Sequence, residues 1–329
     1  MVQPVAVVFV HGINTPSAGY ESDMRAAIEA RLPAHIKDLV TFKAVYWAQR
    51  VRDRQQDYLD AVAKDRLFAD TVHRRLVIQG LGDAAAYQKT RSFRNSAYYQ
   101  IQADVRAVLE DLDRDNLPNR PLIFIGHSLG CHIISSFAWD LNTIKQWNEG
   151  RIAKEDEEVA KFAAYLKDGS PFRRLDTLAG LVMMGCNMPL FTFTFGHKAV
   201  FPITRSRGEG ETPAFPGKAL DDKTLSVARW LNYYSRNDLL GFPLKPLNDA
   251  YACEPLLSDI EVASEGLLRR LASNIFAPIA AYRAHVGYWT HRKVLRGAAG
   301  LIAAIVNAGE PPAKSRFAFL RGGKSGAKA

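Results

Sequence analysis

The five residues Gly126-His127-Ser128-Leu129-Gly130 directly follow an apolar run at 121–125. A serine between two glycines behind such a run is typical of a nucleophile elbow, the sharp turn from a buried strand into a helix. The glycines fit places where the strained backbone leaves no room for a side chain. We expect this turn to push the Ser128 hydroxyl up into solvent, where it could attack a carbonyl carbon.

A serine hydroxyl is a poor nucleophile at neutral pH, so Ser128 needs a histidine base and an acid that orients it. In the elbow architecture the partners follow in the order serine, acid, histidine. His197 precedes any plausible acid, and His291 starts a predicted helix, where a polar side chain usually faces water. His285 lies in the loop-like segment before that helix, so we predict His285 as the base.

The acid can be chosen by its place relative to the strands, because only residues just past a strand's carboxyl end can reach the elbow. Asp238 follows the predicted strand 228–234 and meets this condition. Asp249, in the proline-rich loop 243–255, is the alternative, although an aspartate in a turn is more often a backbone cap. The remaining candidates precede strands or lie in the helix after the elbow, namely Asp140, Asp176, Asp221, Asp222 and Asp259.

Acyl transfer chemistry also needs hydrogen-bond donors for the negative oxygen of a tetrahedral intermediate. In the elbow geometry one donor is the N–H of Leu129, the residue after the nucleophile. The second should come from the loop after the first strand, most simply the N–H of Ile13, with His11 and Gly12 shaping that loop.

The elements that must position these residues are visible as an alternation of apolar runs and helical stretches. This alternation predicts an α/β fold with a mostly parallel sheet between helices. The predicted strands are 5–10, 42–47, 122–125, 178–184, 228–234 and 260–263, and the predicted helices include 96–112, 131–139 and 292–306.

Two segments, 50–94 and 190–223, look like insertions in this plan. The first is rich in charged residues and helix formers, with Gly80-Leu81-Gly82-Asp83 as a predicted break, and the second is rich in proline, glycine and phenylalanine. Both leave from the carboxyl ends of strands, where ligands bind in open α/β sheets. They are candidates for a cap or lid; ordinary surface insertions are the alternative.

These residues resemble the α/β-hydrolase superfamily, specifically its lipase and esterase-like members. The matching motifs are Val10-His11-Gly12-Ile13, Gly126-His127-Ser128-Leu129-Gly130, Asn237-Asp238 and His285, in the family's order. The resemblance implies Ser128 as nucleophile, His285 as base, Asp238 as acid, and the amides of Ile13 and Leu129 as an oxyanion hole. The superfamily hosts many reactions, so fold alone does not name one.

The chain has 329 residues, of which 47% are hydrophobic, and a net charge of +9. We predict one α/β-hydrolase domain at 1–310 and a basic, flexible tail at 311–329. The tail allows contact with an anionic membrane surface, although surplus charge for solubility is the explanation that the composition favours, and no nucleic-acid-binding module is visible. No apolar run approaches the length of about 20 residues that spans a bilayer. The N-terminus resembles a core strand rather than a signal peptide, which favours a cytoplasmic location.

The expected function is two-step hydrolysis of a small-molecule or lipid ester through an acyl-enzyme on Ser128. No metal or organic cofactor is implied, since the three cysteines are too few and scattered for a zinc site. The sequence also allows a thioesterase, an acyltransferase, or a catalytically silent scaffold or lipid-surface binding protein. An apolar group suggests an acyl pocket or lid, with core packing as the alternative: Met183, Met184, Met188, Leu190, Phe191, Phe193 and Phe195.

Overall fold

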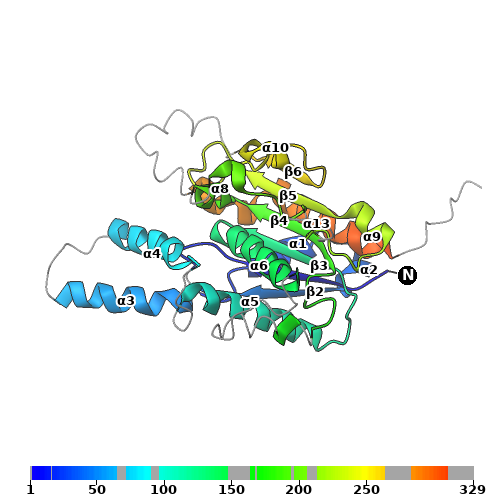
Figure 1. Ribbon diagram of the computed structural model, residues 1–329, viewed down its shortest axis with the longest axis horizontal. Coiled ribbons are helices and arrows are strands. Elements are labelled where there is room, and N and C mark those ends of the chain that lie inside the picture. The colour runs from blue at the N-terminus through cyan, green and yellow to red at the C-terminus, as the bar shows by residue number, and fades with distance from the viewer. Residues whose placement is uncertain are drawn as a thin grey trace, which may run out of the picture.

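The computed structural model describes residues 2–15, 17–64, 72–89, 96–146, 164–166, 169–193, 196–205, 213–263 and 283–309. Within these ranges six strands form one sheet in the order β2-β1-β3-β4-β5-β6, and every neighbouring pair is parallel (Figure 1). The strands are β1 (Val5–Val10), β2 (Val40–Val45), β3 (Leu122–His127), β4 (Leu178–Met184), β5 (Arg229–Tyr234) and β6 (Leu257–Glu261). The predicted α/β fold with a parallel sheet between helices is therefore confirmed.

The central strands have the clearest sequence signal. All residues of β1 and β4 are buried, as expected for strands of a parallel sheet covered on both faces, and both have their predicted bounds. The two edge strands begin earlier than predicted, β2 at Val40 and β6 at Leu257. Most of their residues are only partly buried, so their apolar pattern marks the strand ends poorly.

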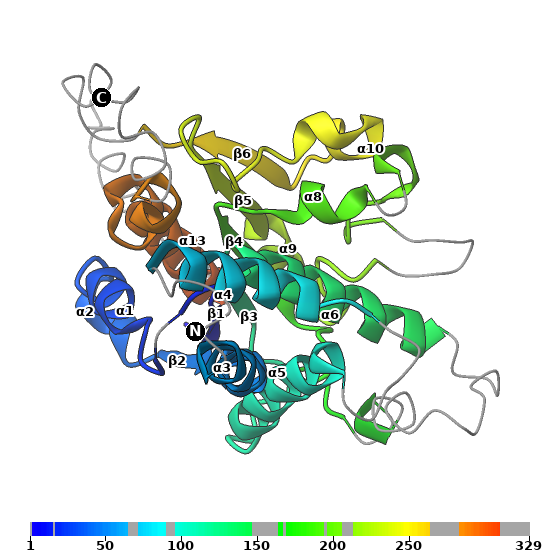
Figure 2. The same ribbon diagram turned by 90° about the vertical axis from the view of Figure 1, so that its left-hand side faces the viewer.

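Helices cover both faces of the sheet (Figures 1 and 2). Alternate residues of β1 point to two separate cores: Val8 packs in the core with α5 and α6, and Val7 in the core with α1 and α13. The helices are α1 (Ser22–Glu29), α2 (Ala34–Lys37), α3 (Gln49–Lys64), α4 (Val72–Ala86), α5 (Ala97–Asp113), α6 (Leu129–Gln146), α8 (Met188–Thr192), α9 (Asp222–Val227), α10 (Asp249–Ala252) and α13 (Arg292–Ala308), with 3-10 turns η1 (His197–Ala199), η2 (Lys245–Leu247) and η3 (Gly287–Thr290).

The described residues of the first insertion form the helices α3 and α4, which lie at the end of the sheet where the strands finish (Figures 1 and 2). The predicted break at residues 80–83 is wrong, because α4 continues through it to Ala86. A side chain on Gly82 would come within 2.8 Å of Gln55 Nε2 on α3. Glycine at this position allows the two helices to pack closely, and this tertiary contact outweighs the low helix propensity of glycine.

The second insertion is described except for 194–195 and 206–212, and it contains α8, η1 and the start of α9. The predicted apolar group divides between two environments. Met183 and Met184 are fully buried in β4, whereas the Phe193 side chain after α8 is 73% exposed. Phe195 and the predicted basic tail 311–329 lie outside the described residues.

In the part of the chain that the structure describes, none of the helices combines the length and the apolar character needed to cross a membrane.

Candidate active site

Ser128 occupies a strained turn between β3 and α6. Its φ of +51° is a left-handed backbone conformation that residues other than glycine rarely adopt. The Ser128 N–H donates to Met184 O at 2.9 Å, and the Ser128 carbonyl accepts from the N–H of Cys131 at 3.0 Å. These two bonds tie the turn to the end of β4 and to the first turn of α6.

The two glycines of the motif are needed for close packing around this turn. A Cβ on Gly126 would lie 2.7 Å from Ile134 Cδ1, and one on Gly130 would lie 2.2 Å from Val10 O. Both distances are shorter than any ordinary contact, so a larger residue at either place would displace α6 or β1. The strand, turn and helix predicted around Ser128 are all present.

The expectation that Ser128 projects into solvent is wrong, because the residue is fully buried. The loop after β1 lies against it: a Cβ built on Gly12 would be 2.6 Å from Ser128 Cβ. Ser128 Oγ has no hydrogen-bond partner among the described residues. A buried hydroxyl without a partner is costly, and a catalytic role is one of the explanations for such a group.

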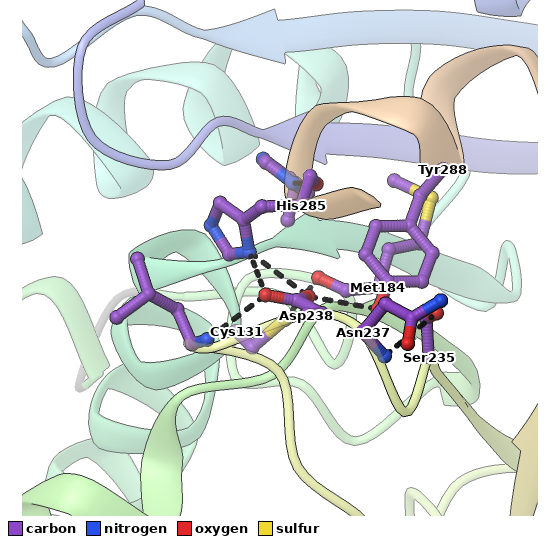
Figure 3. Close-up of polar contacts among 9 residues, drawn as sticks. Cys131, Met184, Ser235, Asn237, Asp238, His285 and Tyr288 are labelled. Atoms are coloured by element: carbon purple, nitrogen blue, oxygen red, sulfur yellow. Dashed lines mark hydrogen bonds and ion pairs between the residues drawn. The ribbon is translucent and has the colours of Figure 1, made fainter. Parts of the chain in front are cut away.

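Asp238 and His285 form a hydrogen-bonded pair, as Figure 3 shows. His285 Nδ1 lies 2.9 Å from Asp238 Oδ1 and 3.0 Å from Oδ2. Asp238 follows β5, and His285 lies in the helical residues 283–286 before η3. Because a carboxylate can only accept, Nδ1 carries the proton and Nε2 is left as the acceptor nitrogen. His285 Nε2 is buried and has no partner among the described residues.

Two further donors hold the Asp238 carboxylate. The Leu240 N–H donates to Oδ1 at 2.9 Å, and the buried Tyr288 hydroxyl donates to Oδ2 at 2.8 Å. Burial alone would raise the pKa of Asp238, but the bond to His285 and its charge, the Leu240 N–H and the Tyr288 hydroxyl together lower it. Asp238 therefore stays ionised, while burial raises the pKa of Tyr288 and keeps its hydroxyl protonated.

Glycines at two strand-end loops leave the space that this pair occupies. A Cβ on Gly185, whose φ is +55°, would lie 3.0 Å from Asp238 Oδ2 and 3.2 Å from His285 Nδ1. A Cβ on Gly241 would lie 2.2 Å from Asp238 Oδ2. Gly185 directly follows Met184, the residue whose carbonyl accepts from Ser128, so the serine turn and the acid–base pair flank the end of β4.

His127, the residue before Ser128, provides a second link between the elbow and His285. Its Nε2 lies 2.7 Å from the His285 carbonyl oxygen, and the two rings are 4.8 Å apart. Burial, together with the neighbouring His285, lowers the pKa of His127 to about 3. His127 is therefore neutral at ordinary pH, with the proton on Nε2, and donates to the backbone of His285.

The loop after β1 carries Ile13, the predicted second oxyanion donor. The Gly12 carbonyl accepts from the Thr15 hydroxyl at 3.1 Å and lies 2.7 Å from His11 Nδ1. Gly12 C=O and Ile13 N–H belong to one planar trans peptide and point in opposite directions, so holding the carbonyl also fixes the N–H. The other predicted donor, the Leu129 N–H, is the first of α6 and has no acceptor within the helix.

His11 is itself held in one tautomer. The Trp47 N–H donates to His11 Nε2 at 3.1 Å, and the two rings stack with centroids 4.6 Å apart. Since Nε2 accepts, Nδ1 carries the proton and donates to Gly12 O. Burial lowers the pKa of His11 to about 3, so this arrangement persists at ordinary pH.

Sequence reasoning missed the supporting residues Tyr288, His127, Gly185 and Gly241. Gly185 and Gly241 carried a usable signal, since each lies shortly after a predicted strand at the reacting edge. Asp249, the alternative acid, is exposed in α10. Arg236, two residues before Asp238 in the chain, forms an ion pair with Glu261 at 3.0 Å. No group of three metal-ligating side chains occurs among the described residues.

Comparisons with known proteins add little to this geometry. No protein-family model matches the chain, and no curated protein does. Among solved structures, an iodinated complex of an acetyl xylan esterase matches with 11% identity and a TM-score of 0.29, over 85% of this chain and 96% of that chain. This likeness is too weak to carry an activity over to this protein.

Proposed function

We propose that this protein is a serine hydrolase of carboxylic esters, built as a member of the α/β-hydrolase superfamily. The observation that carries the proposal is the pair of buried atoms Ser128 Oγ and His285 Nε2, which have no partner among the described residues. Ser128 is bonded to Met184 at the end of β4, and His285 lies beside Gly185, the next residue. Nε2 is the acceptor nitrogen that a general base needs, and Asp238 holds the ring in that tautomer.

In the proposed reaction Ser128 Oγ attacks the acyl carbon and His285 Nε2 takes the hydroxyl proton. The carbonyl oxygen becomes an oxyanion, which the N–H groups of Ile13 and Leu129 stabilise. His285 then gives its proton to the leaving alcohol, and a water activated by the same nitrogen releases the acid and restores Ser128. Asp238 stays ionised throughout and stabilises the imidazolium.

Because Ser128 is buried, a substrate must displace the groups that cover it. The loop after β1 packs on Ser128, and α4 of the first insertion packs on that loop, which supports a lid role for this insertion. Exposed apolar side chains on two loops of the same edge, Phe193 after α8 and Leu239 after Asp238, favour an ester with an apolar group.

The test is covalent labelling of Ser128 with a fluorophosphonate probe, with hydrolysis of p-nitrophenyl acetate and butyrate measured in parallel. The wild type should be labelled and should turn over both esters. Ser128→Ala should lose the label and lower kcat by about 10⁶-fold, the scale of nucleophile removal in serine proteases. Ser135→Ala, in the same helix, is the control and should retain both. Labelling of Ser128→Ala at the wild-type rate would contradict the proposal.

A further inference from the structure

The first insertion reaches the loop that carries the proposed oxyanion donor. Asp83 on α4 accepts a hydrogen bond from the Asn14 N–H at 3.1 Å, although the two residues are 69 positions apart in the sequence. On the other side of the same loop, Arg52 of α3 donates to the Thr15 carbonyl oxygen. A Cβ on Gly80 of α4 would lie 3.3 Å from Ile13 Cδ1, so the helix packs directly on this loop.

Ile13 lies between two peptide units that are both held by hydrogen bonds. The unit before it has its Gly12 carbonyl held by Thr15 and His11. The unit after it has its Asn14 N–H held by Asp83. The first unit sets the direction of the Ile13 N–H, because that N–H shares one plane with the Gly12 carbonyl. The second unit ties the loop to α4, so that Ile13 is held from both sides.

Asn14 needs this support because its own backbone is strained. Its φ is +57°, in the left-handed region that only glycine adopts without cost. Without Asp83, the peptide between Ile13 and Asn14 could rotate toward a relaxed conformation, and the loop would lose this bond to α4. The Gly12–Ile13 peptide, which carries the Ile13 N–H, would keep its bonds at the Gly12 carbonyl but would lose the support on its far side and gain freedom to shift.

Asp83 is arranged as a fixed acceptor rather than as a surface charge. The residue is only 4% exposed, and Gln55 of α3 donates to its second oxygen at 3.0 Å. Burial raises the pKa of Asp83, and the Asn14 N–H, the Gln55 amide and the charge of Arg52 oppose that rise. A buried carboxylate that accepts from a loop amide and from a glutamine side chain is placed to hold that loop.

We propose that Asp83 is a positioning residue that sets the oxyanion donor at Ile13, so that the α3–α4 insertion is part of the catalytic support and not only a lid. This inference rests on the proposed hydrolase function. It predicts that losing the Asp83 acceptor impairs stabilisation of the transition state while leaving ground-state substrate binding largely unchanged.

The experiment compares Asp83→Ala, which removes the acceptor, with Asp83→Asn, which keeps an oxygen in place. Asp60→Asn, an exposed aspartate on α3, is the matched control. Three quantities are measured in each full-length protein: hydrogen exchange at the Asn14 amide, kcat and KM for p-nitrophenyl butyrate, and the inhibition constant of an alkyl boronic acid. The boronate adduct places an anionic oxygen where the oxyanion forms.

Asp83→Ala should speed exchange at Asn14 by about tenfold or more, with β1 still protected. It should lower kcat by about 10- to 100-fold, less than the 10²- to 10³-fold that follows removal of an oxyanion donor, with KM within about twofold. The affinity of the boronic acid, measured as its inhibition constant, should fall in proportion to kcat. Asp83→Asn should restore most of the protection at Asn14, of kcat and of the boronate affinity. Asp60→Asn should match the wild type in all three.

Unchanged exchange at Asn14 in Asp83→Ala would overturn the inference, because the contact would then not hold the loop. Faster exchange with unchanged kcat and boronate affinity would overturn it too, because the loop would not set the donor. If Asp83→Ala does not fold, Asp83→Asn with wild-type exchange but a lowered kcat would count against it. A wild type without turnover or labelling removes the hydrolase function itself, a failure that is visible before any variant is made.

Discussion

The candidate site has two halves that are supported in different ways. In the acid–base half, Asp238 and His285 are held by groups on neighbouring strand-end loops and on the turn before α13. In the oxyanion half, the loop after β1 is held on one side by His11 and on the other by the inserted helices α3 and α4. The first half depends on the basic sheet architecture, and the second depends on an addition to it.

This difference indicates which changes each half should tolerate. The acid–base half is packed around glycines with no spare space, so a small added group should disturb it strongly. The oxyanion half depends on hydrogen bonds from the inserted helices α3 and α4, so its support should weaken gradually as those bonds are removed. The predictions below test whether the two halves really behave so differently.

The largest effect is expected from Asp238→Asn. An amide in this place has an oxygen and an NH₂ group, and it can hold His285 in the tautomer with Nε2 protonated, which cannot act as a base. In a serine protease the equivalent change costs about 10⁴-fold in kcat, and we expect a loss of that size. Hydrolysis of p-nitrophenyl butyrate measures it.

Asp249→Asn is the matched control for this prediction, because Asp249 is the other acid that the sequence allowed and is exposed in α10. It should keep kcat within about twofold, as expected for a surface change. A loss of similar size in the two variants would mean that the acid–base half is not organised around Asp238.

The contact between Asp238 and His285 agrees with the sequence prediction, and the place of Asp238 was predictable because it follows from the rules of a parallel sheet. Ser128 and Asp238 each follow a strand of the sheet, β3 and β5, and the carboxyl ends of parallel strands meet at one edge. The apolar runs of β1 and β4 were long and continuous enough to give the strand bounds directly.

The support of the oxyanion half was not predictable in the same way. Asp83 lies in a helix with no apolar pattern that relates it to Asn14, and Gly80 and Gly82 indicated a break where the helix in fact continues. Burial of Ser128 was missed for a related reason, since it follows from how closely the loop after β1 packs on the elbow. Contacts between an insertion and a distant loop depend on tertiary packing, which local sequence patterns do not encode.

A smaller effect is expected from adding one methyl group at Gly241. The Cβ would lie 2.2 Å from Asp238 Oδ2 and 2.7 Å from Gly185 Cα, so the acid loop must move. We expect Gly241→Ala to lower the free energy of unfolding by about 3 kcal/mol, the upper range for overpacking, and to reduce kcat as well. Urea denaturation and p-nitrophenyl butyrate hydrolysis measure the two effects.

Gly300→Ala is the control for that substitution. Gly300 lies in the exposed part of α13, and a Cβ there would meet nothing within 4 Å. Alanine is favoured over glycine inside a helix by about 1 kcal/mol, so this variant should be slightly more stable and fully active. If Gly241→Ala behaved like Gly300→Ala, the acid–base half would be looser than its contacts indicate.

The smallest effect is expected on the pH dependence of stability, where one buried histidine from each half can be compared. His127 holds the His285 carbonyl and His11 holds the Gly12 carbonyl, and burial lowers the pKa of each to about 3. An unfolded histidine has a pKa of about 6.5, so below that pH the unfolded state binds more protons than the native state. This contribution to stability is present above pH 6.5 and is lost as the pH falls.

As the pH falls from 6.5 to 5, the free energy of unfolding should therefore decrease by up to about 2 kcal/mol for each of these imidazoles, because one pKa unit corresponds to about 1.4 kcal/mol. Asp238 does not contribute in this range, since its lowered pKa matters only below about 4. Urea denaturation at pH 7, 6 and 5 measures how steeply the free energy of unfolding depends on pH. His127→Phe and His11→Phe should each reduce this slope by an amount that corresponds to at most one proton taken up on unfolding.

Equal reductions in the two variants would mean that both carbonyls are held by neutral imidazoles. A reduction in His127→Phe alone would show that water reaches His11 in the oxyanion half. The rigidity of the loop after β1 would then come from the inserted helices α3 and α4 rather than from the loop itself.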